Sequence, residues 1–200
     1  MKIKPSNDKN VVDQWISQQG DYTYRVKYNL NTTSIVVDVG ARHGNWSNLI
    51  RSAYNPKIYC FEVVPEFCNQ LIQNGYKTFC VAVSDKKEKI KLGIFESEAS
   101  MFYTESAFEC DAIPASEIFN LINQTHIDLL KINVEGAEYK ILDELISSKN
   151  ITKISNIQVQ FHLFDTTDNN YYEPLAKKLS ETHVLSWRFP FVWENWVLKN

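Results

Sequence analysis

Short apolar segments alternate along the chain with longer segments in which apolar residues recur every three or four positions. Short apolar runs bounded by glycine or polar residues are typical of buried strands, and the longer periodicity is typical of helices. The pattern predicts strands at 35–39, 57–62, 76–84, 88–95, 127–133 and 153–164. It predicts helices at 10–19, 46–54, 65–74, 115–124, 137–148 and 171–181, the first of them ended by Gly20.

Strands that alternate with helices indicate βαβ units, in which a mainly parallel sheet carries helices on both faces. We place the strand at 88–95 at the edge of that sheet. Residues 96–111 show no clear period and predict a long loop, with at most one short strand near Phe108.

The last two strands, 183–189 and 191–198, predict an antiparallel hairpin whose aromatic residues form its core rather than a sugar-binding platform. No linker, repeat or low-complexity segment interrupts the chain. We therefore predict a single α/β domain over residues 1–200: a doubly wound, mainly parallel sheet with a C-terminal hairpin and a short N-terminal helical extension at 1–20.

Composition narrows the function classes. The 21 Lys and Arg against 24 Asp and Glu give a formal net charge of −3, so we expect no nucleic-acid partner, which would require a basic surface. No apolar run approaches the ~20 residues that span a bilayer, and the polar N-terminus does not resemble a signal peptide. We expect a cytoplasmic protein with no membrane contact; the oligomeric state cannot be inferred.

The four cysteines form no CxxC pair, and the four histidines show no HExxH spacing. Such spacings would indicate a structural or catalytic metal site. We therefore expect reduced, mostly buried thiols and no metal. The cysteines are Cys60, Cys68, Cys80 and Cys110.

Polar and glycine residues follow the strands where parallel α/β sheets bind ligands, beyond the carboxyl ends of the strands. Gly40 and Gly44 follow the first strand and allow a tight turn and a close approach of ligand to backbone. Glu62 ends the second strand, 22 residues beyond Gly40, where an acid can accept both hydroxyls of a ribose. Ser84 and Asp85 follow the third.

This arrangement fits a nucleoside-containing cofactor, and the glycine loop distinguishes two classes. A dinucleotide site needs G-x-G-x-x-G, because the pyrophosphate approaches the second glycine closely. Here Arg42 and Asn45 occupy the second and third glycine positions. S-adenosyl-L-methionine carries no phosphate, so the loop favours that cofactor over NAD.

The four segments together resemble the FkbM family of methyltransferases in order and spacing, over roughly residues 35–165. They are VVDVGARHGNWS (36–47), CFEVVPE (60–66), VAVSD (81–85) and LLKINVEGAEYKIL (129–142). The resemblance implies a Rossmann-like class I methyltransferase fold. It also implies transfer of a methyl group from S-adenosyl-L-methionine to a hydroxyl of a sugar, glycan or small natural product.

The same resemblance implies roles for individual residues. Lys131, Asn133 and Glu135 would line the site beside the transferred methyl group. Asn133 stands where the family usually has Asp, and an amide cannot take up a proton, although it can orient a hydroxyl or the cofactor amine. The cofactor contacts would be Asp38, Gly40, Ala41, Gly44, Ser47, Glu62, Ser84 and Asp85.

His162 is the candidate general base, because its strand should end at the same rim as Asn133 and because a neutral imidazole accepts protons near pH 7. The methylation rate would then rise with pH through the histidine range. His43, in the glycine loop, is the reserve. Lys131 lies within an apolar strand and needs a carboxylate partner, for which Glu135 or Glu138 is available.

Two other functions remain open from the sequence. A non-catalytic S-adenosylmethionine-binding protein of the same fold would have lost its chemistry at Asn133, and an NAD-dependent oxidoreductase is disfavoured by the glycine loop. The acceptor pocket is expected from the loops at 96–112 and 163–172, whose sequences do not identify the acceptor.

Overall fold

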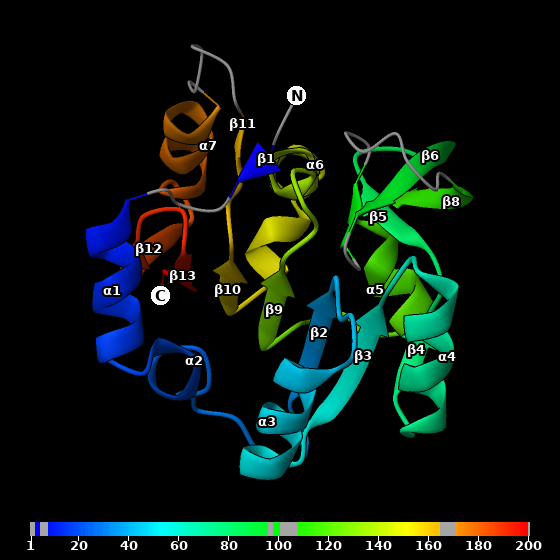
Figure 1. Ribbon diagram of the computed structural model, residues 1–200, viewed down its shortest axis with the longest axis horizontal. Coiled ribbons are helices and arrows are strands. Elements are labelled where there is room, and N and C mark those ends of the chain that lie inside the picture. The colour runs from blue at the N-terminus through cyan, green and yellow to red at the C-terminus, as the bar shows by residue number, and fades with distance from the viewer. Residues whose placement is uncertain (1–2, 5–7, 96–97, 101–107, 165–170, 200) are drawn as a thin grey trace.

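A computed structural model describes residues 3–4, 8–95, 98–100, 108–164 and 171–199, and this part of the chain centres on a seven-stranded sheet (Figure 1). The strand order is β12-β13-β10-β9-β2-β3-β4. Strands β2, β3, β4, β9 and β10 run parallel, and β12 and β13 form an antiparallel hairpin beside β10. The prediction of a mainly parallel sheet with a terminal hairpin is confirmed. The strands are β2 (Ile35–Val39), β3 (Lys57–Phe61), β4 (Lys77–Phe79), β9 (Leu129–Ile132), β10 (Asn156–Val159), β12 (His183–Phe189) and β13 (Trp193–Leu198).

Helices cover both faces of this sheet, as a doubly wound fold requires. Successive side chains of a strand point to opposite faces, so Val37 of β2 packs with α5, α6 and α7 while its neighbour Val36 packs with α3 and α4. No helix in the described residues is both long and apolar enough to cross a bilayer. The helices are α3 (Asn45–Tyr54), α4 (Pro65–Gln73), α5 (Glu117–Ile122), α6 (Glu138–Ser147), the 3-10 helix η1 (Asn150–Lys153) and α7 (Tyr172–Leu179).

The N-terminal segment is more than a helical extension. Helix α1 (Lys9–Ser17) ends before Gly20, which instead begins a second helix, α2 (Gly20–Thr23). A Cβ at Gly20 would lie 2.2 Å from the Trp15 ring, so the glycine is needed for the close packing of the two helices. Trp15 is buried against Phe189 and Trp193 of the hairpin. The aromatic residues of the hairpin therefore form core, as expected.

The predicted strand at 76–84 is two strands in two sheets. β4 ends at Phe79, and β5 (Ala82–Ser84) joins a four-stranded sheet of order β5-β8-β6-β7, seen at the upper right of Figure 1. The strand at 88–95 is thus not the edge of the central sheet, and the predicted loop at 96–111 contains strands. The pairings of residues 108–114 with 82–84 and with 88–92 are non-local, so local periodicity did not reveal them. The other strands of this sheet are β6 (Glu88–Phe95), β7 (Glu98–Ser100) and β8 (Phe108–Pro114).

The predicted strand at 153–164 is also interrupted. It begins as η1, forms β10 and ends in β11 (Leu163–Phe164), which pairs with β1 (Ile3–Lys4) away from the central sheet. Residues 160–162 therefore lie beyond the carboxyl end of β10, where they can face a ligand.

A disulfide joins Cys68 of α4 to Cys80, which follows β4. The expectation of four reduced thiols is therefore wrong for this pair, because a spacing of 12 residues carries no signature and only the fold brings α4 beside β4. Cys60 and Cys110 are free. Burial raises the pKa of the Cys60 thiol to about 12, so that thiol stays protonated.

We expect reduction of the Cys68–Cys80 bond to lower the free energy of unfolding by about 3 kcal/mol, because the closed loop restricts the unfolded chain. Urea unfolding with and without dithiothreitol measures the change. The double variant Cys68→Ser/Cys80→Ser is the control and should not respond to dithiothreitol. An unchanged unfolding midpoint for the reduced native protein would contradict the prediction.

Candidate active site

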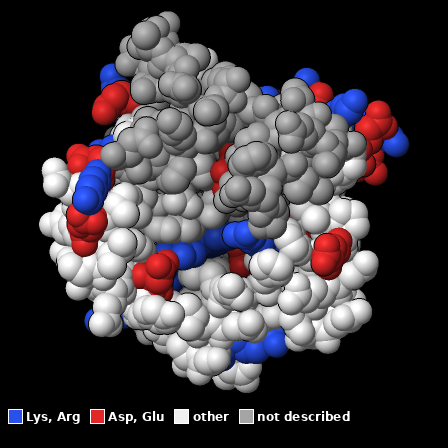
Figure 2. Space-filling view, in the orientation of Figure 1, with Lys and Arg blue, Asp and Glu red and all other residues white. Residues whose placement is uncertain are grey.

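A cavity of about 490 Å³ opens at the carboxyl ends of the parallel strands. The order of the strands reverses between β2 and β9, and such a switch point is where α/β sheets bind ligands. Figure 2 shows a hollow on this face with positively charged side chains gathered in it. The cavity brings together nine of the candidate residues from the sequence: Gly40, Ala41, His43, Glu62, Ser84, Lys131, Asn133, Glu135 and His162.

The two glycines of the β2–α3 loop serve different purposes. Gly40 has φ +76°, and a Cβ there would lie 1.8 Å from the Asn133 carbonyl oxygen, so only glycine lets the two loops meet below the cavity. Gly44 has φ +78° and precedes α3. Its missing Cβ would meet Leu71 of α4 at 2.8 Å. Gly44 is therefore required for helix packing, and it does not line the cavity in the described residues.

Asp38, Ser47 and Lys131 form a buried cluster beneath the glycine loop. One Asp38 carboxylate oxygen accepts a hydrogen bond from the Ser47 hydroxyl at 2.6 Å, and the other accepts from Lys131 Nζ at 2.8 Å. Lys131 Nζ also donates to the Gly40 carbonyl at 2.7 Å. The expected partner of Lys131, Glu135 or Glu138, is thus replaced by Asp38, because β2 and β9 pair in register at these residues. This ion pair fixes the loop that borders the cavity.

Glu62 lies at the end of β3 and is 6% exposed. Its Oε2 accepts the backbone N–H of Arg42 at 2.7 Å, and its Oε1 accepts those of Val63 and Val64 at 2.9 Å. A carboxylate has about four lone-pair sites, so the side chain is held firmly and can still accept hydroxyl donors from the cavity. Arg42 has φ +49°, a backbone conformation that presents its N–H to Glu62.

Ser84 borders the cavity, whereas Asp85 does not. Ser84 is buried and its hydroxyl donates to Asp85 Oδ1 at 2.9 Å. Around it the cavity wall is apolar, formed by Phe67 of α4, Val83 of β5 and Leu92 of β6, among others. This part of the cavity suits a flat, mostly apolar group.

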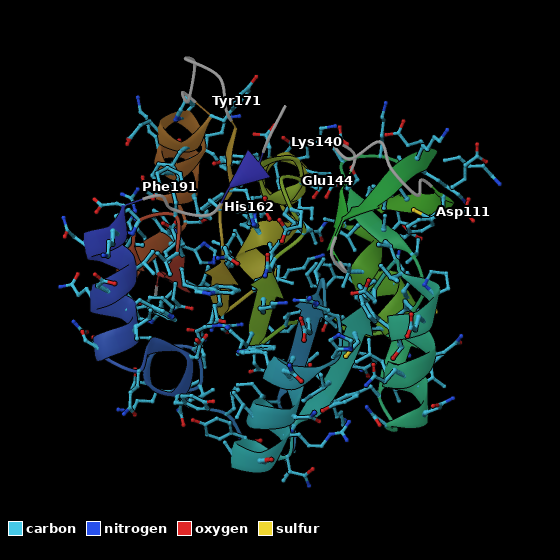
Figure 3. All side chains as sticks on the ribbon, in the orientation of Figure 1. Asp111, Lys140, Glu144, His162, Tyr171 and Phe191 are labelled. Atoms are coloured by element: carbon cyan, nitrogen blue, oxygen red, sulfur yellow. A yellow bond between two sulfur atoms is a disulfide. The ribbon has the colours of Figure 1, made fainter. Side chains whose placement is uncertain are left out.

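His162 is 2% exposed and lies between two carboxylates. Its Nδ1 is 2.8 Å from Glu138 Oε1, and its Nε2 is 3.1 Å from Glu135 Oε2. Figure 3 labels His162 at the edge of the sheet toward which the arrows of β2 and β9 point. Burial alone would lower the pKa of His162, but Glu138 and Glu135 outweigh it and raise the pKa to about 10. The ring is therefore protonated at neutral pH and donates to both acids.

This protonation state changes the role expected for His162. A neutral imidazole accepting a proton near pH 7 does not fit a ring whose pKa is about 10. Glu135 lines the cavity and its side chain is 17% exposed, so its carboxylate is placed to accept the proton instead of His162. Glu135 has φ +53°, which is uncommon for a residue with a side chain and is typical of constrained functional loops.

Glu138 holds this loop together and is fully buried. Its Oε1 accepts the backbone N–H of Val134 at 2.9 Å, and its Oε2 accepts that of Gly136 at 3.0 Å. The sequence suggested Glu138 as a possible partner of Lys131. Its contacts make it the residue that fixes the β9–α6 loop and orients His162.

Asn133 lines the cavity and carries a buried polar atom. Its side-chain oxygen Oδ1 is buried and has no hydrogen-bond partner among the described residues. Leaving a buried acceptor unsatisfied costs about 1–3 kcal/mol, so this oxygen favours a ligand that brings an N–H or O–H donor.

Some lining residues were not singled out from the sequence. Arg25, after α2, and Gln160, after β10, border the cavity together with Trp46 at the start of α3. Gln160 directly follows β10, but the predicted strand at 153–164 placed it inside the strand, so its position at a strand end was missed. Arg25 precedes the first parallel strand, so no strand-end signal could reveal it. Of the two expected acceptor loops, residues 96–97, 101–107 and 165–170 lie outside the described residues.

Comparison with known proteins identifies the family. The model of the methyltransferase FkbM domain matches residues 38–185. The chain belongs to the FkbM methyltransferase family. A search of the curated proteins finds no match. Membership makes the protein a methyltransferase and replaces the oxidoreductase alternative.

Solved structures agree with the fold of this FkbM methyltransferase. A putative rRNA-methylase from Clostridium thermocellum is similar over 100% of this chain and 99% of its own, with 12% identity and a TM-score of 0.53. A chain of a fibrillarin/Nop5p complex is similar over 92% of this chain and 82% of its own, with 11% identity and a TM-score of 0.52. At these identities the similarity shows the fold alone, that of the Rossmann-like class I methyltransferases.

Proposed function

We propose that the protein binds S-adenosyl-L-methionine in the cavity and methylates a hydroxyl group of a sugar, glycan or small natural product. The observation that carries the proposal is the combination, in one cavity, of a strand-end acid, an apolar slot and an unsatisfied buried acceptor. These three features match the ribose, the adenine and the amine of this cofactor.

Each feature implies a role. Glu62 would accept the ribose hydroxyls, and the apolar slot beside Ser84 would hold the adenine. Asn133 Oδ1 would accept from the cofactor amine. Asp38, Ser47 and Lys131, which lie beneath the loop, would position the backbone of Gly40 and Ala41 against the ligand, while Gly44 and Asp85 would support α3 and Ser84. When bound, S-adenosyl-L-methionine supplies an electrophilic methyl group on a sulfonium.

Glu135 is the residue that we propose as general base. An alcohol must lose its proton as its oxygen is methylated, and a carboxylate within hydrogen-bond reach can take it. His162 and Glu138 would act as positioning residues that aim Glu135 at the acceptor, because His162 donates to both acids. The acidic net charge of −3 favours a small-molecule or glycan acceptor over a nucleic acid, and this preference is part of the proposal.

The proposed acceptor class is tested by release of S-adenosylhomocysteine from S-adenosyl-L-methionine in the presence of candidate acceptors. Monosaccharides, nucleotide sugars and hydroxylated natural products should support turnover, whereas tRNA and rRNA fragments should not. Turnover with RNA alone would contradict the acceptor class. Cofactor binding without turnover on any acceptor would favour the non-catalytic alternative.

We expect the Glu62→Gln variant to bind S-adenosylhomocysteine about 10- to 100-fold more weakly than the native protein, because hydrogen bonds to a charged acceptor are worth about 1.5–3 kcal/mol. Calorimetric titration measures the affinity. Glu66→Gln is a matched control, since Glu66 is exposed in the first turn of α4 and does not line the cavity. Equal affinities of the native protein and Glu62→Gln would remove Glu62 from the site.

A further inference from the structure

Arg25 is a nearly buried cation that borders the cavity and has no role in the chemistry described so far. It follows α2, its side chain is 14% exposed, and its guanidinium lies over the Trp193 ring at 3.8 Å from the centroid. A guanidinium remains charged at any physiological pH. Arg25 therefore places a fixed positive charge in the wall of the cavity.

The contacts of Arg25 hold this charge in place. Its Nε donates to Gln158 Oε1 at 3.1 Å, and its Nη1 donates to Asp21 Oδ1 at 2.6 Å. Its backbone carbonyl accepts from Gln158 Nε2 and from Trp46 Nε1, both at 3.0 Å. Backbone and side chain are thus both fixed to β10 and α3, so the guanidinium is preorganised rather than mobile.

The charge of Arg25 is only partly compensated by the protein. Burial lowers the pKa of the guanidinium, and the contact with Asp21 only partly offsets that effect. Asp21 is the one carboxylate that forms an ion pair with Arg25 among the described residues, and that side chain is 51% exposed. Asp38 attracts the guanidinium from farther away. Of the five N–H groups of a guanidinium, Arg25 uses one on Gln158 and one on Asp21. A buried cation of this kind favours an anionic ligand.

The position of Arg25 in the cavity indicates which anion it meets. Arg25 contacts β10, whereas Glu62 ends β3, and the strand order between them is β10-β9-β2-β3. Three strand spacings of about 4.8 Å place the backbones of β10 and β3 about 14 Å apart. The long side chains of Arg25 and Glu62 shorten this distance across the cavity. Asn133, with its unsatisfied Oδ1, follows β9 between these two ends.

We propose that Arg25 binds the α-carboxylate of the amino-acid part of the cofactor, opposite the ribose end at Glu62 and beside the amine at Asn133. This inference rests on the proposed function. It makes the site selective for nucleosides that carry a complete amino acid, because a ligand without the carboxylate leaves the charge of Arg25 only partly compensated, by Asp21. Arg25 also lies on an N-terminal segment that packs on the hairpin, so that segment becomes part of the cofactor site.

A matched pair of ligands tests the inference without any mutation. S-adenosylhomocysteine and its decarboxylated form, S-adenosyl-3-thiopropylamine, share the nucleoside, the sulfur and the amine and differ in the carboxylate. We expect the native protein to bind S-adenosylhomocysteine at least about tenfold more tightly by calorimetry, as the loss of a charged hydrogen-bond pair predicts. Equal affinities for the two ligands would overturn the inference. Binding of neither would instead overturn the proposed function.

Variants assign the selectivity to Arg25. In Arg25→Gln the two ligands should bind within about threefold of each other, because the charge is gone, while Arg25→Lys should keep part of the preference. Arg42→Asn is the control, since it removes the other arginine of the cavity wall at a position of φ +49° that Asn tolerates. It should retain the full preference.

Loss of the preference in Arg42→Asn, or its persistence in Arg25→Gln, would overturn the assignment. Circular dichroism of each variant without ligand confirms that it folds. If Arg25→Gln does not fold, two titrations with the pair of ligands decide the question, one of Arg25→Lys and one of the native protein. An undiminished tenfold preference in Arg25→Lys would contradict the role of the planar guanidinium.

Discussion

We expect the Glu135→Gln variant to transfer methyl groups about 10²- to 10⁴-fold more slowly than the native protein, the range that a general base contributes. Glutamine keeps the size of the side chain but cannot take up the proton that the acceptor hydroxyl loses. The affinity for S-adenosylhomocysteine should not change, because the lost interaction belongs to the transition state. Single-turnover rates with radiolabelled S-adenosyl-L-methionine and calorimetry on the same sample measure the two quantities.

Glu173→Gln is the control for this prediction, since Glu173 is exposed on α7 and does not line the cavity. A native single-turnover rate in Glu135→Gln would retire Glu135 as the base. An equal loss of rate and cofactor affinity would make it a binding residue instead.

We expect the His162→Asn variant to be less stable than the native protein by about 3–5 kcal/mol near neutral pH, the cost of removing one partner of a buried ion pair. Without the imidazolium, Glu135 and Glu138 face each other as two carboxylates with no cation between them. The rate should fall as well, because Glu135 loses the contact that orients it. Urea unfolding and single-turnover rates on the same sample measure both effects.

The pH dependence of stability and of the methylation rate distinguishes a positioning role from a general-base role for His162. Its pKa is raised from 6.5 to about 10 in the folded protein, so folding favours the protonated ring. The resulting stabilisation is complete below pH 6.5 and is lost as pH rises toward about 10. The free energy of unfolding of the native protein should therefore decrease across this window, and the advantage over His162→Asn should shrink with it.

His126→Asn is the control, at an exposed position near Ser155. Its free energy of unfolding should depend on pH in the same way as that of the native protein. The methylation rate should show no rise with a midpoint near 6.5, since the ring is already protonated and stays so. A rate that rises through pH 6.5 in the native protein but not in His162→Asn would restore His162 as the base.

The mainly parallel sheet and the positions of several cavity residues could be predicted from the sequence because the parallel strands are apolar runs. Their carboxyl ends meet at one edge, so Gly40, Glu62 and Asn133 follow directly from the strand assignments. The small sheet could not be predicted in this way. β5 and β6 are held by pairing with β8 across a gap of more than a dozen residues, which local periodicity does not record.

Within the site, residue positions were easier to predict than residue roles. Lys131 was expected to pair with an acid, but which acid depended on the register between β2 and β9. His162 was found at the expected rim, yet its protonation state is set by two carboxylates that come close only through the turn at Glu135 and Gly136. Arg25 belongs to no motif, and only the packing of the N-terminal segment on β10 brings it to the cavity.

The central claim is that the cavity carries out transfer of a methyl group to a hydroxyl oxygen. Incubation with S-adenosyl-L-[methyl-¹³C]methionine and the acceptor panel, followed by ¹³C NMR of the product, tests it most directly. We predict a labelled methyl carbon bonded to oxygen, formed in equal amount to S-adenosylhomocysteine and nearly lost with Glu135→Gln. A labelled methyl carbon bonded to nitrogen or carbon, or formation that is unaffected in Glu135→Gln, would contradict the account.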